Sequence, residues 1–114
     1  MAHLPREGKL LRIFVGEQDK WNGQPLYQAI VALARKQGLA GATCLKGFLG
    51  FGAHSQLHSA KLLDISQDLP VVIEIVDSEE KIQQFLPLLD PMVTSGLITL
   101  EKAEVLVCRV KGTS

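Results

Sequence analysis

Hydrophobic positions along the chain follow two periods, one typical of strands and one typical of helices. Apolar residues alternate with polar ones, or run together, in four short stretches, and they recur every three or four positions after Pro25 and again after Asp77. A loop is expected over 16–24. Four strands are predicted, over residues 10–15, 42–51, 69–76 and 98–110. The predicted order is therefore β-α-β-β-α-β.

Signals for helix ends accompany both helical stretches. Pro25 suits the first position of the first helix, and Gly38 suits its end. Asp77 and Glu80 have the spacing of a capping box, which predicts that the second helix begins there. Pro87 lies inside the apolar pattern of the second helix, so we expect a kink or an early end at that point.

This order predicts an α+β fold, a ferredoxin-like βαββαβ sandwich with a four-stranded antiparallel sheet and two helices on one face. The 114 residues fit a single domain, residues 1–114, whose core spans about residues 10–110. The first and third strands are expected in the centre of the sheet. Cys44 and Cys108 then lie on opposite edges, roughly 14 Å apart, so no disulfide is expected. Both cysteines are predicted to be small buried residues.

Two strands of the predicted sheet are apolar on both faces. In the third strand, Val72 and Val76 lie on the face opposite Ile73 and Ile75, and the last strand has a similar pattern. Because two helices cover only one face, the second face needs another cover. We favour a second copy of the chain as that cover. An arm formed by residues 52–68 is the alternative.

Composition and charge narrow the function classes. The formal net charge is zero, whereas nucleic-acid binding proteins usually carry a basic excess, so no nucleic-acid partner is expected. A likeness of residues 46–51 to an RNA-recognition signature falls on the second strand rather than the third. No signal peptide or membrane span is evident, so a cytoplasmic protein is expected. No nucleophile motif is evident either, so no enzyme is predicted.

Candidate chemistry gathers in the middle of the chain. Glycines within 46–52 would let the backbone approach a ligand or offer N–H groups to an anion. A bend at the end of a strand explains them equally well. His54 and His58 have the i, i+4 spacing of metal ligands on a helix, but their glycine- and serine-rich surroundings favour a loop. Asp64 and Asp68 are the nearby carboxylates, and metal binding is kept as an alternative.

Two stretches of the chain resemble PII signalling proteins. Residues 38–52 resemble the helix-to-strand passage of those proteins, and residues 68–77 resemble their third strand. The chain is more similar still, over roughly residues 10–110, to a PII-like bacterial and archaeal family, domain of unknown function 190. The residues that carry this resemblance are Gly16-Glu17, Pro25-Leu26-Tyr27, Gly50-Phe51-Gly52, His58 and Gly96-Leu97-Ile98-Thr99.

The resemblance implies a homotrimer whose three sheets face a central axis, with ligand clefts between neighbouring subunits. In PII proteins such clefts bind adenine nucleotides, so AMP or ADP is the implied ligand. A loop over residues 52–68, with Ser55 and His58, would engage a partner such as a membrane transporter or an ion exporter. The ligand-binding residues that the resemblance implies are Thr43, Gly50, Phe51, Gly52, Glu74, Val76, Arg109 and Lys111.

The chain departs from the PII pattern before the last strand. PII proteins have a glycine-aspartate-glycine-lysine loop there, whereas this chain has residues 96–101 without the lysine. Glu101 would repel phosphate, so a less charged nucleotide, or another anion or metabolite, is expected rather than a triphosphate. Tyr27 is the sole tyrosine, so no tyrosyl modification of the loop is expected. The alternative function is a divalent-metal-binding trimer that resembles cation-tolerance proteins, with His54 and His58 as ligands.

Overall fold

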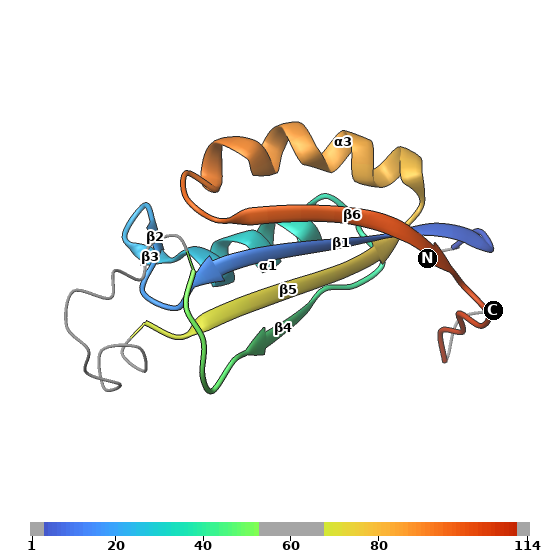
Figure 1. The fold of residues 1–114 in the computed structure, drawn as a ribbon. Helices are drawn as coiled ribbons and strands as arrows, with labels where there is room; N and C mark the ends of the chain where they lie inside the picture. The colour runs from blue at the N-terminus through green and yellow to red at the C-terminus, as the bar shows by residue number, and fades with distance from the viewer. Residues whose placement is uncertain (1–3, 53–67, 112–114) are drawn as a thin grey trace.

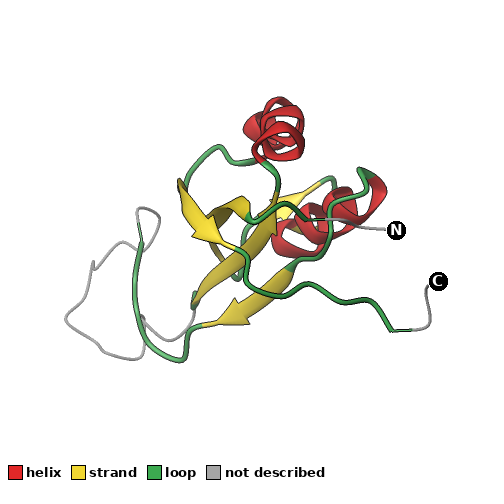
Figure 2. Cartoon of the chain, turned by 90° about the vertical axis from the view of Figure 1, so that its right-hand side faces the viewer, coloured by secondary structure: helices red, strands yellow, loops and turns green. Residues whose placement is uncertain are grey.

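A four-stranded antiparallel sheet forms the centre of the molecule, and both α-helices lie on one of its faces (Figures 1 and 2). The computed structural model describes residues 4–52 and 68–111. The elements are β1 (Glu7–Gly16), β2 (Lys20–Trp21), β3 (Gln24–Pro25), α1 (Leu26–Lys36), β4 (Thr43–Lys46), β5 (Pro70–Asp77), α3 (Glu79–Leu89), the 3₁₀ turn η1 (Asp90–Met92) and β6 (Leu97–Glu104). The predicted α+β fold is confirmed.

The order of strands in the sheet is β4-β5-β1-β6. The predicted first and third strands, β1 and β5, therefore occupy the centre, as expected. Ile13 of β1 pairs directly with Ile73 of β5 on one side and with Ile98 of β6 on the other. Both pairings are antiparallel, so β1 ends beside the starts of β5 and β6. This end of the sheet carries the candidate site described below.

The core lies between the sheet and the two helices. Alternate residues of β1 and β5 point into it, as the period of two predicts. The helices contribute apolar residues at helical spacing, since α1 buries Leu26 and Ile30 and α3 buries Ile82, Phe85 and Leu89. The strand residues that complete this core are Leu11, Ile13, Val15, Val71, Ile73 and Ile75.

The start of α3 differs from the prediction. The N-cap is Ser78, whose side chain accepts a hydrogen bond from the Lys81 N–H at 3.2 Å. Asp77 is buried, and its carboxylate accepts hydrogen bonds from the N–H groups of Ser78 and Ala40. The predicted capping box at Asp77 is therefore wrong by one residue, because that carboxylate ties the segment before β4 to the end of β5.

Pro87 does not end α3, which continues to Leu89. A proline removes one hydrogen bond of the helix interior. The ladder nevertheless resumes beyond it, because the Asp90 N–H bonds to the Leu86 carbonyl. Phe85 and Leu89 are buried on either side of Pro87. Their packing keeps the last turn on the sheet, so the expected early end is wrong.

Strand lengths also depart from the prediction. The segment expected as a loop contains the small hairpin β2–β3, whose turn has Asn22 and Gly23 at positive φ. Of the predicted strand over 42–51, only four residues form a strand, which is β4. The predicted last strand ends at Glu104, after which the chain leaves the sheet (Figure 1). In the segment that follows, Leu106, Val107 and Val110 are exposed.

Both cysteines are free, as predicted, yet both are exposed, which corrects the expected burial. Cys44 lies on the edge strand β4, directly paired with Ile73, and desolvation raises the pKa of its thiol. Cys108 lies beyond the end of β6. Among the described helices none is long and apolar enough to cross a membrane.

Candidate functional site

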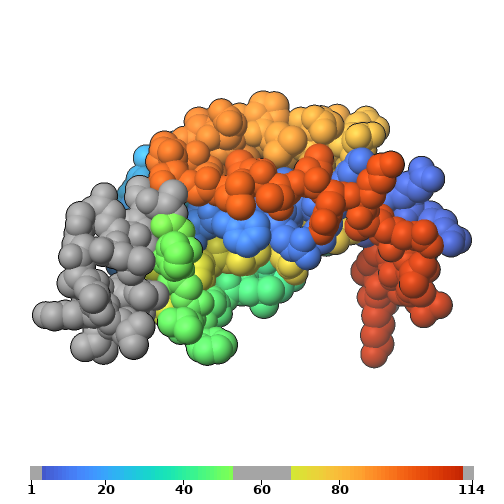
Figure 3. Space-filling view, in the orientation of Figure 1, coloured from blue at the N-terminus to red at the C-terminus, as the bar shows by residue number. Residues whose placement is uncertain are grey.

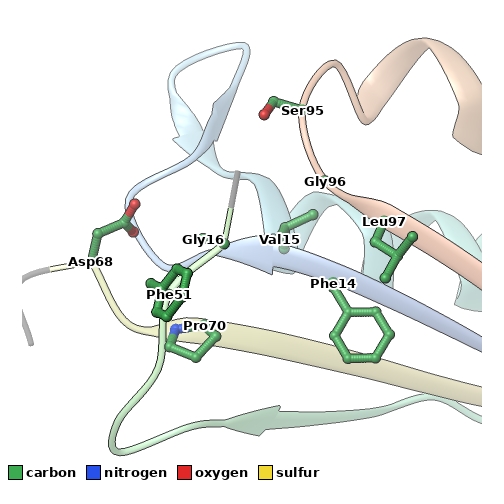
Figure 4. A pocket seen from close by; sticks show the side chains of 10 residues that line it. Phe14, Val15, Gly16, Phe51, Asp68, Pro70, Ser95, Gly96 and Leu97 are labelled. Carbon is green, nitrogen blue, oxygen red and sulfur yellow. The ribbon is translucent and has the colours of Figure 1, made fainter. Parts of the chain in front are cut away.

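A cavity of about 260 Å³ lies at the end of the sheet where the central strand β1 ends (Figure 4). Four segments form its walls: the end of β1, the segment after β4, the start of β5 and the turn before β6. Asp68 and Phe51 lie on one side of it, and Ser95 and Leu97 lie on the other. The described lining residues are Phe14, Val15, Gly16, Phe51, Gly52, Asp68, Pro70, Ser95, Gly96 and Leu97.

Close backbone packing brings these segments together, and glycine is required for it at several positions. A Cβ added to Gly96 would lie 2.4 Å from the carbonyl oxygen of Phe14. A Cβ added to Gly47 or Gly50 would lie 2.9 Å from Pro70 Cγ, and Gly50 also has a φ of +153°. The Gly47 N–H donates to the Pro70 carbonyl at 2.7 Å. A bend packed on β5 therefore accounts for Gly47 and Gly50.

Gly52 differs from these glycines. It lines the cavity, but a Cβ added to it would meet no described atom within 4 Å. Packing of the described residues thus does not require a glycine at this position.

Asp68 is the one ionisable side chain among the described lining residues. Its Oδ1 accepts a hydrogen bond from the Gln18 N–H at 3.0 Å. Next to it, the Glu17 N–H donates to the Leu69 carbonyl at 2.8 Å. Both Asp68 carboxylate oxygens lie within 2.9 Å of where a Cβ of Gly16 would stand. The loop after β1 thus holds the carboxylate at the cavity wall.

Lys46 lies beside this region but is engaged elsewhere. Its Nζ lies 2.5 Å from Oε2 of Glu17. The hydrogen bond to Glu17 raises the pKa of Lys46, so the ammonium stays charged and paired. Lys46 is not among the cavity-lining residues. The described wall of the cavity is therefore apolar and acidic rather than basic.

The face of the sheet away from the helices is the second feature of note. In Figure 3, β1 (blue) is visible between β6 and β5 on this face. Arg12 lies at its centre, with Nε 2.9 Å from Glu74 Oε2 and NH1 2.5 Å from Glu101 Oε1. These two hydrogen bonds, to Glu74 first, raise the pKa of Arg12. Apolar residues and two threonines surround this ion-pair group, and we call the whole surface the open face: Leu10, Arg12, Phe14, Thr43, Leu45, Val72, Glu74, Val76, Leu97, Thr99 and Glu101.

The structure divides the predicted ligand-binding residues into three groups. Phe51 and Gly52 line the cavity, with Gly50 beside them against Pro70. Thr43 and Glu74 form a direct pair on the open face, which Val76 shares. Within one chain these residues are not all brought together.

The third group, Arg109 and Lys111, lies in the segment beyond Glu104. Glu104 pairs with Glu7 at the start of β1, whereas the cavity lies at the end of β1. The two basic residues therefore extend from the opposite end of the sheet (Figure 1). Glu101, expected to repel phosphate, pairs in register with Leu10 and is not a lining residue.

Sequence reasoning missed several residues of the cavity. Phe14, Gly16, Asp68 and Ser95 stand far apart in the sequence and belong to no common motif. Antiparallel pairing of β1 with β5 and β6 was the available signal, because it places the end of one strand beside the starts of the others. Asp68 had a predicted role only as a neighbour of the histidine pair.

The predicted loop and metal residues fall outside the described part of the chain. Ser55, His54 and His58 all belong to residues 53–67. Within residues 4–52 and 68–111, no group of three or more histidine, cysteine or acidic side chains is arranged to hold a metal ion.

Comparisons with known proteins place the chain in a family. The family described as DUF190, Uncharacterized ACR, matches residues 8–105. The chain belongs to the DUF190 family. A UPF0166 protein of Aquifex aeolicus (strain VF5) is 42% identical over 98 residues, which cover 86% of this chain and 92% of that protein. A UPF0166 protein of Methanocaldococcus jannaschii is 35% identical over 100 residues, covering 87% and 92%.

Solved structures similar to this fold include PII-like proteins, which confirms the predicted relationship in fold. One is CPII from Thiomonas intermedia K12, a nitrogen regulatory PII-like protein bound to ADP, AMP and bicarbonate. It has a TM-score of 0.63 and 18% identity, and the match covers 90% of this chain and 97% of that one. A second CPII structure, bound to ADP and bicarbonate, has a TM-score of 0.62 and 22% identity, with 87% and 88% covered. This chain thus shares the PII-like fold at low sequence identity.

Proposed function

We propose that this DUF190 protein is a PII-like regulatory protein that assembles as a homotrimer and binds an adenine nucleotide, AMP or ADP, in clefts between subunits. It senses the ligand and does not transform it. The observation that carries the proposal is the cavity at the end of β1, lined by Phe51 and Gly52. It occurs in a fold whose neighbour CPII is bound to ADP and AMP.

The size of the cavity supports a site shared between subunits. Pockets for complete small ligands enclose roughly 300–1,000 Å³, and the cavity of one chain, at about 260 Å³, falls just below that range. Arg109 and Lys111 extend from the opposite end of the sheet. They reach the ligand only if a neighbouring copy supplies them, which is what a cleft between subunits requires.

The open face supports assembly of the chain with itself. Phe14, Val72 and Val76 are half-buried there, and Leu45 and Leu97 are exposed. Apolar side chains that stay exposed together on one face are typical of an interaction site. Association of identical copies through it forms a closed, symmetric oligomer without any further segment of the chain.

Ligand binding would act on a partner through the segment between Gly52 and Asp68. Both of these residues line the cavity, so a ligand there contacts both ends of that segment. Ligand binding shifts the segment only if its affinity differs between two states of the segment. A membrane transporter or ion exporter is the partner that we propose.

The test is calorimetric titration of the purified protein with AMP, ADP, ATP and cyclic AMP, with and without Mg²⁺. We expect saturable binding of AMP or ADP at micromolar concentration, a free energy of about −8 kcal/mol, with weaker binding of ATP. Nucleotide recovered unchanged after long incubation with Mg²⁺ would agree with a sensor. Hydrolysis would contradict that part of the proposal.

Two variants with matched controls locate the site. Gly52→Val should abolish binding, whereas Gly41→Val should not, because a Cβ added at either position meets no described atom within 4 Å but only Gly52 lines the cavity. Arg109→Ala should weaken binding about tenfold or more, whereas Arg35→Ala, on the exposed end of α1, should leave it unchanged. Absence of binding to every nucleotide by the wild-type protein would refute the proposed ligand class.

A further inference from the structure

We propose that Asp68 determines which end of the ligand enters the cavity. Its carboxylate accepts hydrogen bonds from the vicinal hydroxyls of a ribose, so that the sugar and base lie inside and the phosphates lie outside. This inference rests on the proposed function, and it adds the orientation of the nucleotide and the residue that selects it.

The charge of the cavity wall is the first observation. Asp68 is the one ionisable side chain among the described lining residues, and the nearby ammonium of Lys46 is paired with Glu17. A phosphate placed against Asp68 would be repelled, because no described cation of the wall offsets the two negative charges. A hydroxyl group is instead attracted, because hydrogen bonds to an ionised acceptor are strong.

The position of the carboxylate is the second observation. The Gln18 N–H holds Oδ1 at 3.0 Å, and the absence of a side chain at Gly16 leaves room for both oxygens. An ionised carboxylate offers about four lone-pair directions, so one backbone donor leaves capacity for two more donors. Acidic residues serve in the same way for the ribose of dinucleotides in Rossmann folds.

The apolar part of the cavity lining is the third observation. Phe51 is 64% exposed and Leu97 is 55% exposed, although both line the cavity together with Phe14 and Pro70 (Figure 4). Large apolar side chains beside a single carboxylate match a nucleoside, which has a flat apolar base and a sugar with two adjacent donors. A ligand of this kind would cover the exposed ring of Phe51 and satisfy Asp68 together.

The test compares isomers of one nucleotide that differ only in where the phosphate is attached. Calorimetry with the wild-type protein should show that 5′-AMP binds at least about tenfold more tightly than 3′-AMP, whose phosphate takes the place of a hydroxyl. In Asp68→Asn this ratio should fall to about threefold or less. The amide oxygen of asparagine still accepts from Gln18, so the loop keeps its hydrogen bond. Glu80→Gln, which makes the same charge change in the first turn of α3, should leave the ratio at its wild-type value.

A second measurement needs no variant. In the wild-type protein, 2′,3′-dideoxy-AMP should bind about tenfold more weakly than 5′-AMP, because both hydroxyl donors are lost. Equal affinity for these two ligands, or an isomer ratio unchanged by Asp68→Asn, would overturn the role of Asp68 while nucleotide binding itself stood. If no adenine nucleotide binds, the proposed function fails, and this inference fails with it.

Discussion

The two faces of the central strands have opposite surroundings. On the helix face, Ile13 and Ile73 form a direct pair, and both are completely buried. One residue further along, Phe14 and Val72 form the neighbouring pair on the open face, and both remain partly exposed. The same alternation of side chains thus serves two purposes. One face completes the fold of the single chain, and the other is the face that we propose for assembly.

The centre of the open face also carries charge, whereas the centre of the helix face, at Ile13 and Ile73, is apolar. Arg12 with Glu74 and Glu101 stands among apolar residues and two threonines, and the group has one carboxylate in excess. Exposed ion pairs add little to the stability of a single chain. In an interface the same group would restrict how copies align, because a shifted alignment would bury unpaired charges. If the proposed assembly holds, the contrast between the faces is one between folding and assembly.

The largest expected effect comes from shortening a buried side chain on the helix face. Ile73→Ala should lower the free energy of unfolding by about 2–5 kcal/mol, because it removes buried methyl groups and leaves a cavity between sheet and helices. Urea denaturation followed by circular dichroism measures this change. Gln83→Ala, at an exposed position of α3, should change stability by about 0.5 kcal/mol or less. A similar change for both variants would show that the helix face does not dominate the stability.

The next effect concerns assembly rather than folding. Val72→Glu places a charge in the middle of the open face, so we expect the proposed trimer to dissociate to monomers at micromolar concentration because an unpaired charge is costly to bury. Sedimentation velocity measures the mass, and circular dichroism checks the fold. Gln83→Glu adds the same charge to an exposed position of α3 and should leave the mass unchanged. A trimeric Val72→Glu protein would mean that the open face is not the interface.

The smallest expected effect concerns Cys44, on the edge strand of the helix face. Cys44 pairs with the buried Ile73 but stands on the edge strand, and desolvation raises the pKa of its thiol. Because the thiolate is the reactive form, the folded protein should reach full reactivity only at higher pH than the unfolded chain. Iodoacetamide labelling of a Cys108→Ser protein, folded and in urea, measures the two pH profiles. Coincident profiles would contradict the desolvation of Cys44.

Strand and helix order could be predicted because burial leaves a periodic pattern. The alternation through Leu11, Ile13 and Val15 is local and does not depend on which element covers it. The same holds for the stripe of Ile82, Phe85 and Leu89. The order of these elements then restricted the sheet to one arrangement, with β1 and β5 in its centre.

Element ends were harder to predict because they depend on contacts with distant residues. Aspartate often caps helices, yet the Asp77 carboxylate accepts a hydrogen bond from the N–H of Ala40, which belongs to another segment. Pro87 signals a break, yet the burial of Leu89 keeps the helix on the sheet. Neither of these contacts can be predicted from a pattern of neighbouring residues, because each involves residues far apart in the sequence.

The candidate site shows the same division. The sequence alone determined the family resemblance, the core alternation, the second apolar face and the glycine-rich segment around Phe51, since each is written in neighbouring residues. Only the tertiary structure decided that Asp68 stands at the wall of a cavity with Phe14, Ser95 and Gly96, and that Arg109 lies at the other end of the sheet. The physical reason is that antiparallel pairing fixes which strand ends meet, and that the close approach of Gly96 to the Phe14 carbonyl arises only when they do.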